Sequence, residues 1–333
     1  MMLEVQKTKN QHTVPQGYLK PFTYDGKRLY VFDKYTQRWN SRSTKSVASL
    51  PYFYDFPEDV RMDFGDPQLV EHIFSGIEPI FYNLRDDVLR TIDRQGRITG
   101  KQRVAMSYFM AVQYLRTVEQ RRNLTEMVRG VGSAAAQLVP EGEKKTPALP
   151  EMWDEYNIAL GHAGILFPPD MLYSQVQVLR NHIWTVGVNE NEGAHPLYTS
   201  DAPVVMKAHS ARPGGIGLGS LGIEIAFPLT PRCLLVLWER TVFGNLVSLD
   251  GTLHSLTSER VRYYNRLQTL RSYQYVCSSS PDFSVAQQTC QRLPDVCHPD
   301  QARLRIQSVR TSPQKMFVHL VWPDPDRSQH EVH

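Results

Sequence analysis

The order of helix-like and strand-like segments constrains this chain more than any other feature. Residues 67–138 carry apolar side chains at helical spacing, in two long stretches. Beyond residue 182, short runs rich in β-branched and aromatic residues follow one another and are joined by turns. Because no regular crossover helices separate these runs, the sequence predicts an α+β fold. We expect a helical layer, residues 67–180, packed on a mostly antiparallel sheet built largely from residues 182–277.

The chain has 333 residues, which is enough for two domains or one large one, and we expect one compact unit. Composition divides it into an N-terminal helix and hairpin element (1–66), the helical region (67–180, with a surface loop at 140–151), the sheet region (182–280) and a C-terminal segment with a frayed tail (281–333).

The two long helical stretches have different stop signals. The first places five apolar residues on one predicted stripe: Leu69, Ile73, Ile77, Ile80 and Leu84. Gly76 and Pro79 are expected to kink or split this helix. The second, residues 100–130, is expected to end at Gly130.

The N-terminal stretch NQHTVPQGYLKPF, residues 10–22, predicts a short helix. Thr13 and Gln16 have the spacing of a capping box, and Pro15 falls in the first turn. His12 would then lie just before the helix, whose positive end disfavours a charged imidazole. We therefore expect a neutral His12 that can act as a base, or else an ordinary structural histidine.

The helix that contains Arg116 predicts a buried charge. Arg116 falls in the middle of an apolar stripe that includes Phe109 and Val112, with Gln113 beside it. A buried guanidinium must find a carboxylate or several carbonyl groups, whereas one near a helix end can extend to water. Glu71 and Glu78 share a face of the preceding helix, and are either exposed to solvent or paired with Arg116.

The segment YTSDAPV contains a second candidate carboxylate. Asp201 either accepts backbone N–H bonds in a local turn or projects from a strand end into a pocket. Ser200 lacks the G-x-S-x-G context of a nucleophile.

Charge favours nucleic acid only locally, since the net charge is +3. Between residues 90 and 130, nine basic residues stand against three acidic ones (Asp93, Glu119 and Glu126). This excess either guides a polyanion or forms a solvated helix surface.

Cofactor and location signals are few. The four cysteines, Cys233, Cys277, Cys290 and Cys297, form no C-x-x-C pair, so we expect reduced thiols and no zinc–cysteine site. GLGSLG, residues 217–222, precedes a strand and is therefore no nucleotide cofactor motif. The first residues lack the apolar core of a signal peptide, and no apolar run approaches the roughly 18 residues of a membrane span. We expect a cytoplasmic protein with no membrane contact.

The motifs together resemble a known family pattern. The first, N-x-H-x-V-P-x-x-Y-L-x-x-F, consists of Asn10, His12, Val14, Pro15, Tyr18, Leu19 and Phe22. With FYDFP, LVEHIFSGIE, QYLRT, TSDAPV and FPLTP further along, it resembles an uncharacterised bacterial family catalogued as domain of unknown function 4238. The resemblance covers about residues 10–280 and supplies no activity.

The resemblance implies one set of polar residues: His12, Glu71, Glu78, Gln113, Arg116 and Asp201. The family's arginine is often followed by Thr-Pro, whereas this chain has Val118, so we expect the helix to continue past Arg116.

Two functional hypotheses follow, and the sequence favours the first. In a nuclease-like phosphoester hydrolase of a defence or toxin system, His12, Asp201 and Arg116 would be catalytic, and Glu71 and Glu78 would hold a divalent metal. Substrate would contact Gln113, Asn10, Ser200, Arg121 and Arg122. In the alternative, a non-catalytic sensing or scaffold protein, the same residues form a buried structural network. A pocket reaching His12 and Asp201 would favour chemistry.

Overall fold

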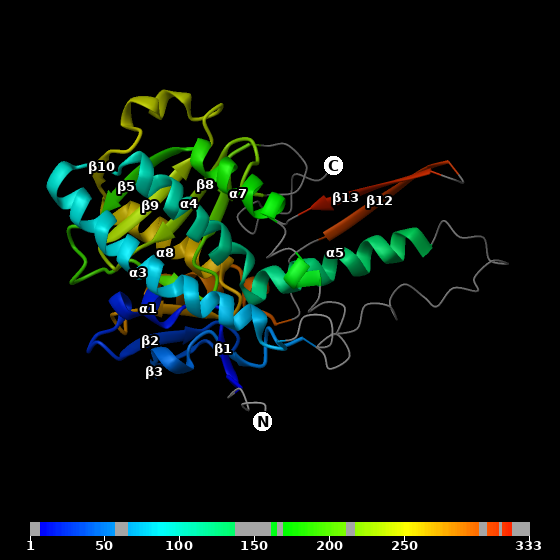
Figure 1. Ribbon diagram of the computed structural model, residues 1–333, viewed down its shortest axis with the longest axis horizontal. Helices are drawn as coiled ribbons and strands as arrows, with labels where there is room; N and C mark the ends of the chain where they lie inside the picture. Colours follow the sequence, from blue (N-terminus) through cyan, green and yellow to red (C-terminus); the bar gives the residue numbers. More distant parts are fainter. Residues whose placement is uncertain are drawn as a thin grey trace.

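The computed structural model describes residues 7–56, 66–136, 161–164, 169–210, 217–299, 305–312 and 315–321. Its fold is α+β, as the sequence predicts: helices pack beside sheets that are mostly antiparallel (Figure 1). The predicted surface loop at 140–151 and the end of the C-terminal tail lie outside these residues. None of the helices in the described ranges has the length and apolarity that a membrane crossing requires.

A five-stranded sheet forms the centre of the molecule. Its strands, in spatial order, are β10 (Leu253–Ser255), β5 (Ile183–Val188), β9 (Cys233–Trp238), β8 (Ile223–Pro228) and β7 (Val205–Ala208). All neighbours are antiparallel except β10 and β5. Every residue of β5, β8 and β9 is buried, which fits their nearly continuous apolar sequences. Both faces of this sheet are therefore covered.

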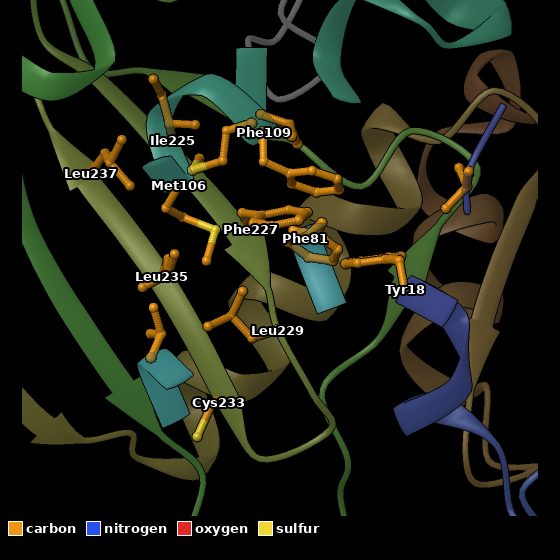
Figure 2. Packing of buried hydrophobic residues seen from close by; sticks show 14 of the residues in the cluster. Tyr18, Phe81, Met106, Phe109, Ile225, Phe227, Leu229, Cys233, Leu235 and Leu237 are labelled. Atoms are coloured by element: carbon orange, nitrogen blue, oxygen red, sulfur yellow. The ribbon is translucent and has the colours of Figure 1, made fainter. Parts of the chain in front are cut away.

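Four helices cover one or other face of this sheet or border it: α3 (Leu69–Gln95), α4 (Gly100–Leu115), α7 (Pro169–Asn181) and α8 (Ser258–Arg271). Leu235 and Leu237 of β9 join one core cluster with α3, α4 and α7, whereas Leu234 and Val236 join another with α8. The alternation follows from the two-residue period of a strand. Figure 2 shows Phe81, Phe109 and Phe227 packed together in the first cluster, with Tyr18 stacked on Phe227 at 5.2 Å between ring centroids.

A second, four-stranded sheet includes the N-terminal hairpin. Its order is β3 (Arg38–Ser43), β2 (Arg28–Asp33), β11 (Tyr275–Ser278) and β6 (Thr199–Ser200), all antiparallel. Two strands within residues 182–277, β6 and β11, therefore belong to this second sheet, and the prediction of one sheet from that range is wrong for them. The apolar strand β2 takes β11 as its second partner, with Phe32 opposite Val276, and β11 in turn pairs with β6.

The remaining elements are short or peripheral. They are β1 (Asn10–His12), α1 (Gln16–Leu19), η1 (Lys20–Phe22), η2 (Thr44–Ser46), β4 (Ser49–Pro51), α5 (Val118–Ala136), η5 (Gly244–Leu249), α9 (Ser284–Arg292), η6 (Pro294–Cys297), β12 (Arg305–Ser312) and β13 (Lys315–Val321). Helix α5 and the β12–β13 hairpin project from the main body (Figure 1).

The buried face of α3 differs from the predicted stripe. Ile80, in the middle of that stripe, is 67% exposed, whereas Phe74, Phe81 and Val88 are buried. The aromatic rings at a seven-residue spacing determine which side faces the core. Helix α3 is also not split at Gly76 or Pro79 and ends where Gly96 takes a left-handed φ of 66°.

The predicted helix over residues 100–130 is in fact two helices. It breaks between Leu115 and Val118, although no proline follows Arg116. The hydroxyl of Thr117 accepts a bond from the Gln120 N–H at 3.3 Å and so caps the start of α5. A capping side chain at the right place thus ends one helix and begins the next.

Two of the four cysteines are bonded, which corrects the prediction of reduced thiols. Cys290 of α9 and Cys297 of η6 form a disulfide, seven residues apart in sequence. Cys233 and Cys277 are free and buried.

The helix α1 packs against α3 through a glycine. A Cβ atom added at Gly17 would lie 2.2 Å from the Cζ atom of Tyr82, whose hydroxyl accepts a bond from the Gly17 N–H at 3.2 Å. The aromatic ring therefore occupies the space that any side chain at this position would need.

We predict that Gly17→Ala lowers the free energy of unfolding by about 1–3 kcal/mol, because the ring must move out of a packed position. Urea denaturation measures it. Gly76→Ala is the matched control, since nothing lies within 4 Å of a Cβ there and the residue is in a helix. That variant should gain up to about 1 kcal/mol. Equal effects of the two changes would contradict the packing described here.

Candidate functional site

His12 lies at the end of a strand and not directly before a helix. It is the last residue of β1, opposite Ser49 of β4. The N–H and the hydroxyl of Thr13 both bond to the carbonyl of Ala48, at 2.8 and 3.1 Å. The Thr13–Gln16 capping box is therefore absent, and Pro15 precedes α1 without a side-chain cap.

His12 is half-buried, and its Nε2 atom lies 3.1 Å from the carbonyl oxygen of Lys45. Burial lowers the pKa of His12; the Lys45 carbonyl and Glu78 act against this shift, and Arg116 adds to it. The imidazole is therefore neutral at pH 7, as predicted. The cause is desolvation and not the end of a helix.

Arg116 is the most deeply buried charged group of this region, with 2% of its surface exposed. Its Nη2 atom donates to the backbone carbonyl of His12 and lies 3.2 Å from Oε1 of Glu78. Its guanidinium carbon lies 4.0 Å from the centre of the Phe74 ring. The prediction of a buried arginine paired with a carboxylate is confirmed, and the alternative of an arginine extended to water is wrong.

Neighbouring side chains hold the next peptide groups of the same segment. Gln113 donates through Nε2 to the carbonyl of Thr13 at 3.1 Å. Arg85 donates to the carbonyl of Gly17 at 2.9 Å. Tyr82 in turn donates to Oε2 of Glu78 at 3.1 Å. Side chains from α3 and α4 thus fix the backbone of residues 12–17.

We call His12, Tyr54, Glu71, Glu78, Gln113 and Arg116 the Arg116 cluster. Within the part of the chain that the structure describes, three of its buried atoms have no hydrogen-bond partner: Oε2 of Glu71, Oε1 of Gln113 and Nε of Arg116. Burial raises the pKa of Glu71 to about 7; Arg116 lowers it and Glu78 raises it further. Glu71 therefore exchanges a proton near neutral pH.

Sequence reasoning assigned no role to Tyr54 or His162, which complete the surroundings of Arg116. The Tyr54 hydroxyl donates to the carbonyl of Arg116 at 2.6 Å. His162 is buried, its Nε2 atom lies 2.8 Å from the Leu115 carbonyl, and burial together with Arg121 lowers its pKa to about 3. Its ring stacks on Tyr54. The FYDFP motif carries Tyr54, so the signal was present without a chemical reason to choose it.

Asp201 is not in contact with the Arg116 cluster. It is buried, and its two oxygens accept backbone N–H bonds from Tyr273, Gln274 and Tyr275, each at 2.8 Å. It thereby fixes the entry into β11. Ser200 donates to Oε1 of Gln268 at 2.7 Å. The geometry therefore favours a role for Asp201 as an acceptor of backbone N–H bonds. The N–H groups belong to residues 273–275 and not to a local turn.

The predicted substrate-binding residues other than Gln113 and Ser200 are placed as follows. Asn10 is exposed at the start of β1. Arg121 lies over the ring of Phe53 at 3.6 Å and donates to Nδ1 of His162 at 3.2 Å. Arg122 donates to Glu126 at 3.0 Å and to the carbonyl of Pro299. Both arginines therefore hold parts of the chain together.

The basic stretch over residues 90–130 is only partly available at the surface. Arg103 pairs with Asp250, and Arg116, Arg121 and Arg122 have the intramolecular contacts given above. Five basic residues are exposed: Arg90, Arg94, Arg97, Lys101 and Arg129. The surface excess of positive charge is thus smaller than the sequence suggests.

Among the described residues, no group of three His, Cys, Asp or Glu side chains is arranged to hold a metal ion. Glu71 and Glu78 therefore have no third protein ligand among them. A hollow of about 50 Å³ has Thr117 and Ala202 in its wall, next in sequence to Arg116 and Asp201. Its wall does not include His12, Arg116 or Asp201.

A family of known sequences matches the part of the chain that contains these contacts. The family described as "Protein of unknown function (DUF4238)" matches residues 10–282. The chain belongs to this family. The match starts at β1 and ends before α9, so it includes both large sheets and the whole Arg116 cluster. No curated protein and no solved structure matches the chain.

We predict that Arg116→Met lowers the free energy of unfolding by about 3–5 kcal/mol, because Glu78 and the His12 carbonyl lose a buried partner. Urea denaturation of both proteins measures this. Arg90→Met is the control: Arg90 pairs with Asp87 at 3.7 Å while 60% and 54% of the two side chains are exposed. That change should cost less than about 1 kcal/mol. A small loss for Arg116→Met would show that the cluster does not hold the fold.

The raised pKa of Glu71 makes stability depend on pH. The folded pKa of about 7 exceeds the ordinary 4.5, so the folded protein binds the proton more tightly than the unfolded chain does. The resulting stabilisation is fully present below about pH 4.5 and is lost as pH rises through about 7. Between pH 5 and pH 8 the free energy of unfolding of Glu71→Gln should therefore fall by about 1–2 kcal/mol less than that of wild type. This figure allows for solvent screening.

Denaturation at both pH values tests this, with the exposed Glu259→Gln as control. Parallel pH profiles of wild type and Glu71→Gln would contradict it.

Proposed function

We propose that the Arg116 cluster is a structural network and that the protein is a non-catalytic scaffold or sensing protein. The observation that carries this is the bond from Arg116 to the backbone carbonyl of His12, with the bond from Gln113 to Thr13 beside it. A guanidinium directed at a peptide carbonyl in a buried position is not free to contact a substrate. Asp201 supports the same conclusion, because three peptide N–H groups occupy its oxygens.

A phosphoester hydrolase is the second candidate, and Glu71 is the observation that favours it. Glu71 is 9% exposed, its Oε2 atom has no hydrogen-bond partner among the described residues, and its pKa is about 7. A general acid works best when its pKa lies near the operating pH. The neutral His12 could serve as base, and the exposed basic residues of the 90–130 stretch could guide a nucleic acid. In this version Glu71 and Glu78 would contribute to a divalent metal site.

The two candidates predict opposite results in one experiment. Wild type, His12→Ala and Glu71→Gln are incubated with RNA, single-stranded DNA, duplex DNA and an aryl phosphate, with and without Mg²⁺ or Mn²⁺. We expect no turnover by any protein, and a loss of about 1–3 kcal/mol of stability for His12→Ala, because the bond to Lys45 and its packing are removed. His195→Ala is the control, since this histidine is exposed.

Turnover by wild type that His12→Ala or Glu71→Gln abolishes, with an unchanged melting temperature, would replace the scaffold by the hydrolase. A nuclease of a defence or toxin system would be the narrower form of that outcome. We also propose that the described parts form one compact unit and that the protein is cytoplasmic. The Cys290–Cys297 disulfide argues against this location, because such bonds are more common in oxidising compartments.

A further inference from the structure

The hairpin of β2 and β3 carries a group of aromatic rings at the surface. Trp39 of β3 is 46% exposed, and Tyr24, four residues before β2, is 44% exposed. Both contact the half-buried ring of Tyr30: Tyr24 stacks on it with 4.7 Å between centroids, and Trp39 meets it edge to face at 5.7 Å. The three rings form one continuous group, which we call the Trp39 surface.

Backbone pairing fixes these rings before any partner binds. Tyr30 is directly opposite Ser41, and Phe32 is directly opposite Trp39, so all four project from one face of the hairpin. The Tyr24 hydroxyl lies 2.8 Å from Oγ of Ser41. Strand β3 is at one end of its sheet and at the periphery of the molecule (Figure 1). A partner can therefore contact rings whose positions are already set.

Positive charge surrounds this surface. Between residues 20 and 46 the chain has seven basic residues and two acidic ones, Asp25 and Asp33. Four of the basic residues are exposed on the hairpin or its flanks and form no ion pair with the described residues: Lys27, Arg28, Arg38 and Lys45. This excess, unlike that of residues 90–130, is largely present at the surface.

Two of these basic residues lie at the end of the hairpin that contains Tyr30. Arg28 is two residues before Tyr30, on the same face of β2. Its Nη2 atom donates to the backbone carbonyl of Ser41 at 3.2 Å, a bond that leaves the positive charge uncompensated. The Thr44 N–H donates to the carbonyl of Lys27 at 3.2 Å, so Lys27 is at this end as well.

Arg38 supplies a charge at the other end of β3. It is next in sequence to Trp39 and directly opposite Asp33 of β2. The Asp33 carboxylate is engaged elsewhere: Oδ1 accepts the N–H of Tyr35 at 2.9 Å, and Oδ2 accepts the amide of Gln274 at 3.1 Å. The rings thus have positive charge at both ends.

Exposed rings flanked by uncompensated cations fit one class of partner best. The bases of a single-stranded nucleic acid stack on aromatic side chains, while Lys and Arg contact the phosphates. In a duplex the bases stack on one another, so their faces are not accessible. A neutral carbohydrate could stack on the same rings, but it would leave the cations without a partner.

We propose that the Trp39 surface binds single-stranded nucleic acid, with bases stacked on Trp39 and Tyr24 and phosphates at Lys27, Arg28 and Arg38. RNA and DNA share this chemistry, so the test includes both. The surface shares no residue with the Arg116 cluster, and the proposal therefore does not rest on the role of that cluster. It would give a scaffold or sensing protein a partner.

Binding is tested on the full chain by fluorescence anisotropy with short labelled oligouridine and oligothymidine. A duplex of the same length and phosphatidylserine vesicles are the competing partners. We expect single strands to bind about tenfold more tightly than the duplex. Their affinity should fall roughly 20- to 50-fold between about 50 and 200 mM salt, as three or four phosphate contacts require. No binding of either oligomer, or equal or tighter binding of duplex or vesicles, would overturn the proposal.

Variants at the rings locate the bases. Trp39→Ala should weaken oligouridine binding about tenfold, because a stacking surface is lost. Tyr173→Ala is the matched control: it removes a ring that is 64% exposed on α7 and should leave binding unchanged. Trp39→Phe keeps a ring and should retain most of the affinity, so it remains informative if Trp39→Ala fails to fold. Unchanged binding in Trp39→Ala would place the nucleic acid elsewhere and overturn the assignment.

Variants at the charges distinguish this surface from the basic stretch over residues 90–130. Arg38→Gln should weaken binding about threefold and lower the salt slope by about 0.7, the value for one phosphate contact of a single strand. Arg94→Gln, which removes an exposed arginine of the other stretch, should change neither quantity. A larger loss from Arg94→Gln than from Arg38→Gln would overturn the proposal.

Discussion

The Arg116 guanidinium, through its bond to the carbonyl of His12 and its contact with Glu78, joins three parts of the molecule that are distant in sequence. Arg116 directly follows α4, His12 is the last residue of β1, and Glu78, the carboxylate partner of Arg116, lies on α3. Removing one buried charge of such a group is costly, while the complete group adds little net stability. In the structural role proposed above, its contribution is to specify one arrangement of these parts. Val14, two residues after His12, belongs to the same hydrophobic core cluster as residues of both sheets, α3 and α4.

The fold class and the pairing of Arg116 could be predicted because both depend on strong local patterns. Strand runs without crossover helices gave the α+β class, and a charge on an apolar stripe required a carboxylate. Other features depended on competition that the sequence does not display. Phe81 competes with Ile80 for the core side of α3, and the larger ring is the one buried. The Thr117 hydroxyl overrides the helical preference of its neighbours.

The site residues show the same limit. Arg116 contacts His12 and Glu78, and Gln113 contacts the neighbouring Thr13, whereas Asp201 accepts bonds from the backbone of residues 273–275. A buried carboxylate needs donors, and peptide N–H groups meet that need as well as a cation does. The sequence alone does not show whether such a carboxylate is paired with peptide N–H groups or with a cation.

The position of β2 in its sheet has a consequence for how the chain is made. Strand β2 has β3 on one side, but its other edge is covered by β11, more than two hundred residues later. The Tyr18 hydroxyl likewise has distant partners, the hydroxyl of Thr199 and the carbonyl of Pro228. Contacts so distant in sequence slow folding, because a long loop must close before they form. During synthesis the edge of β2 that later pairs with β11 therefore presents unpaired backbone N–H and C=O groups, at least until residue 278 has been added.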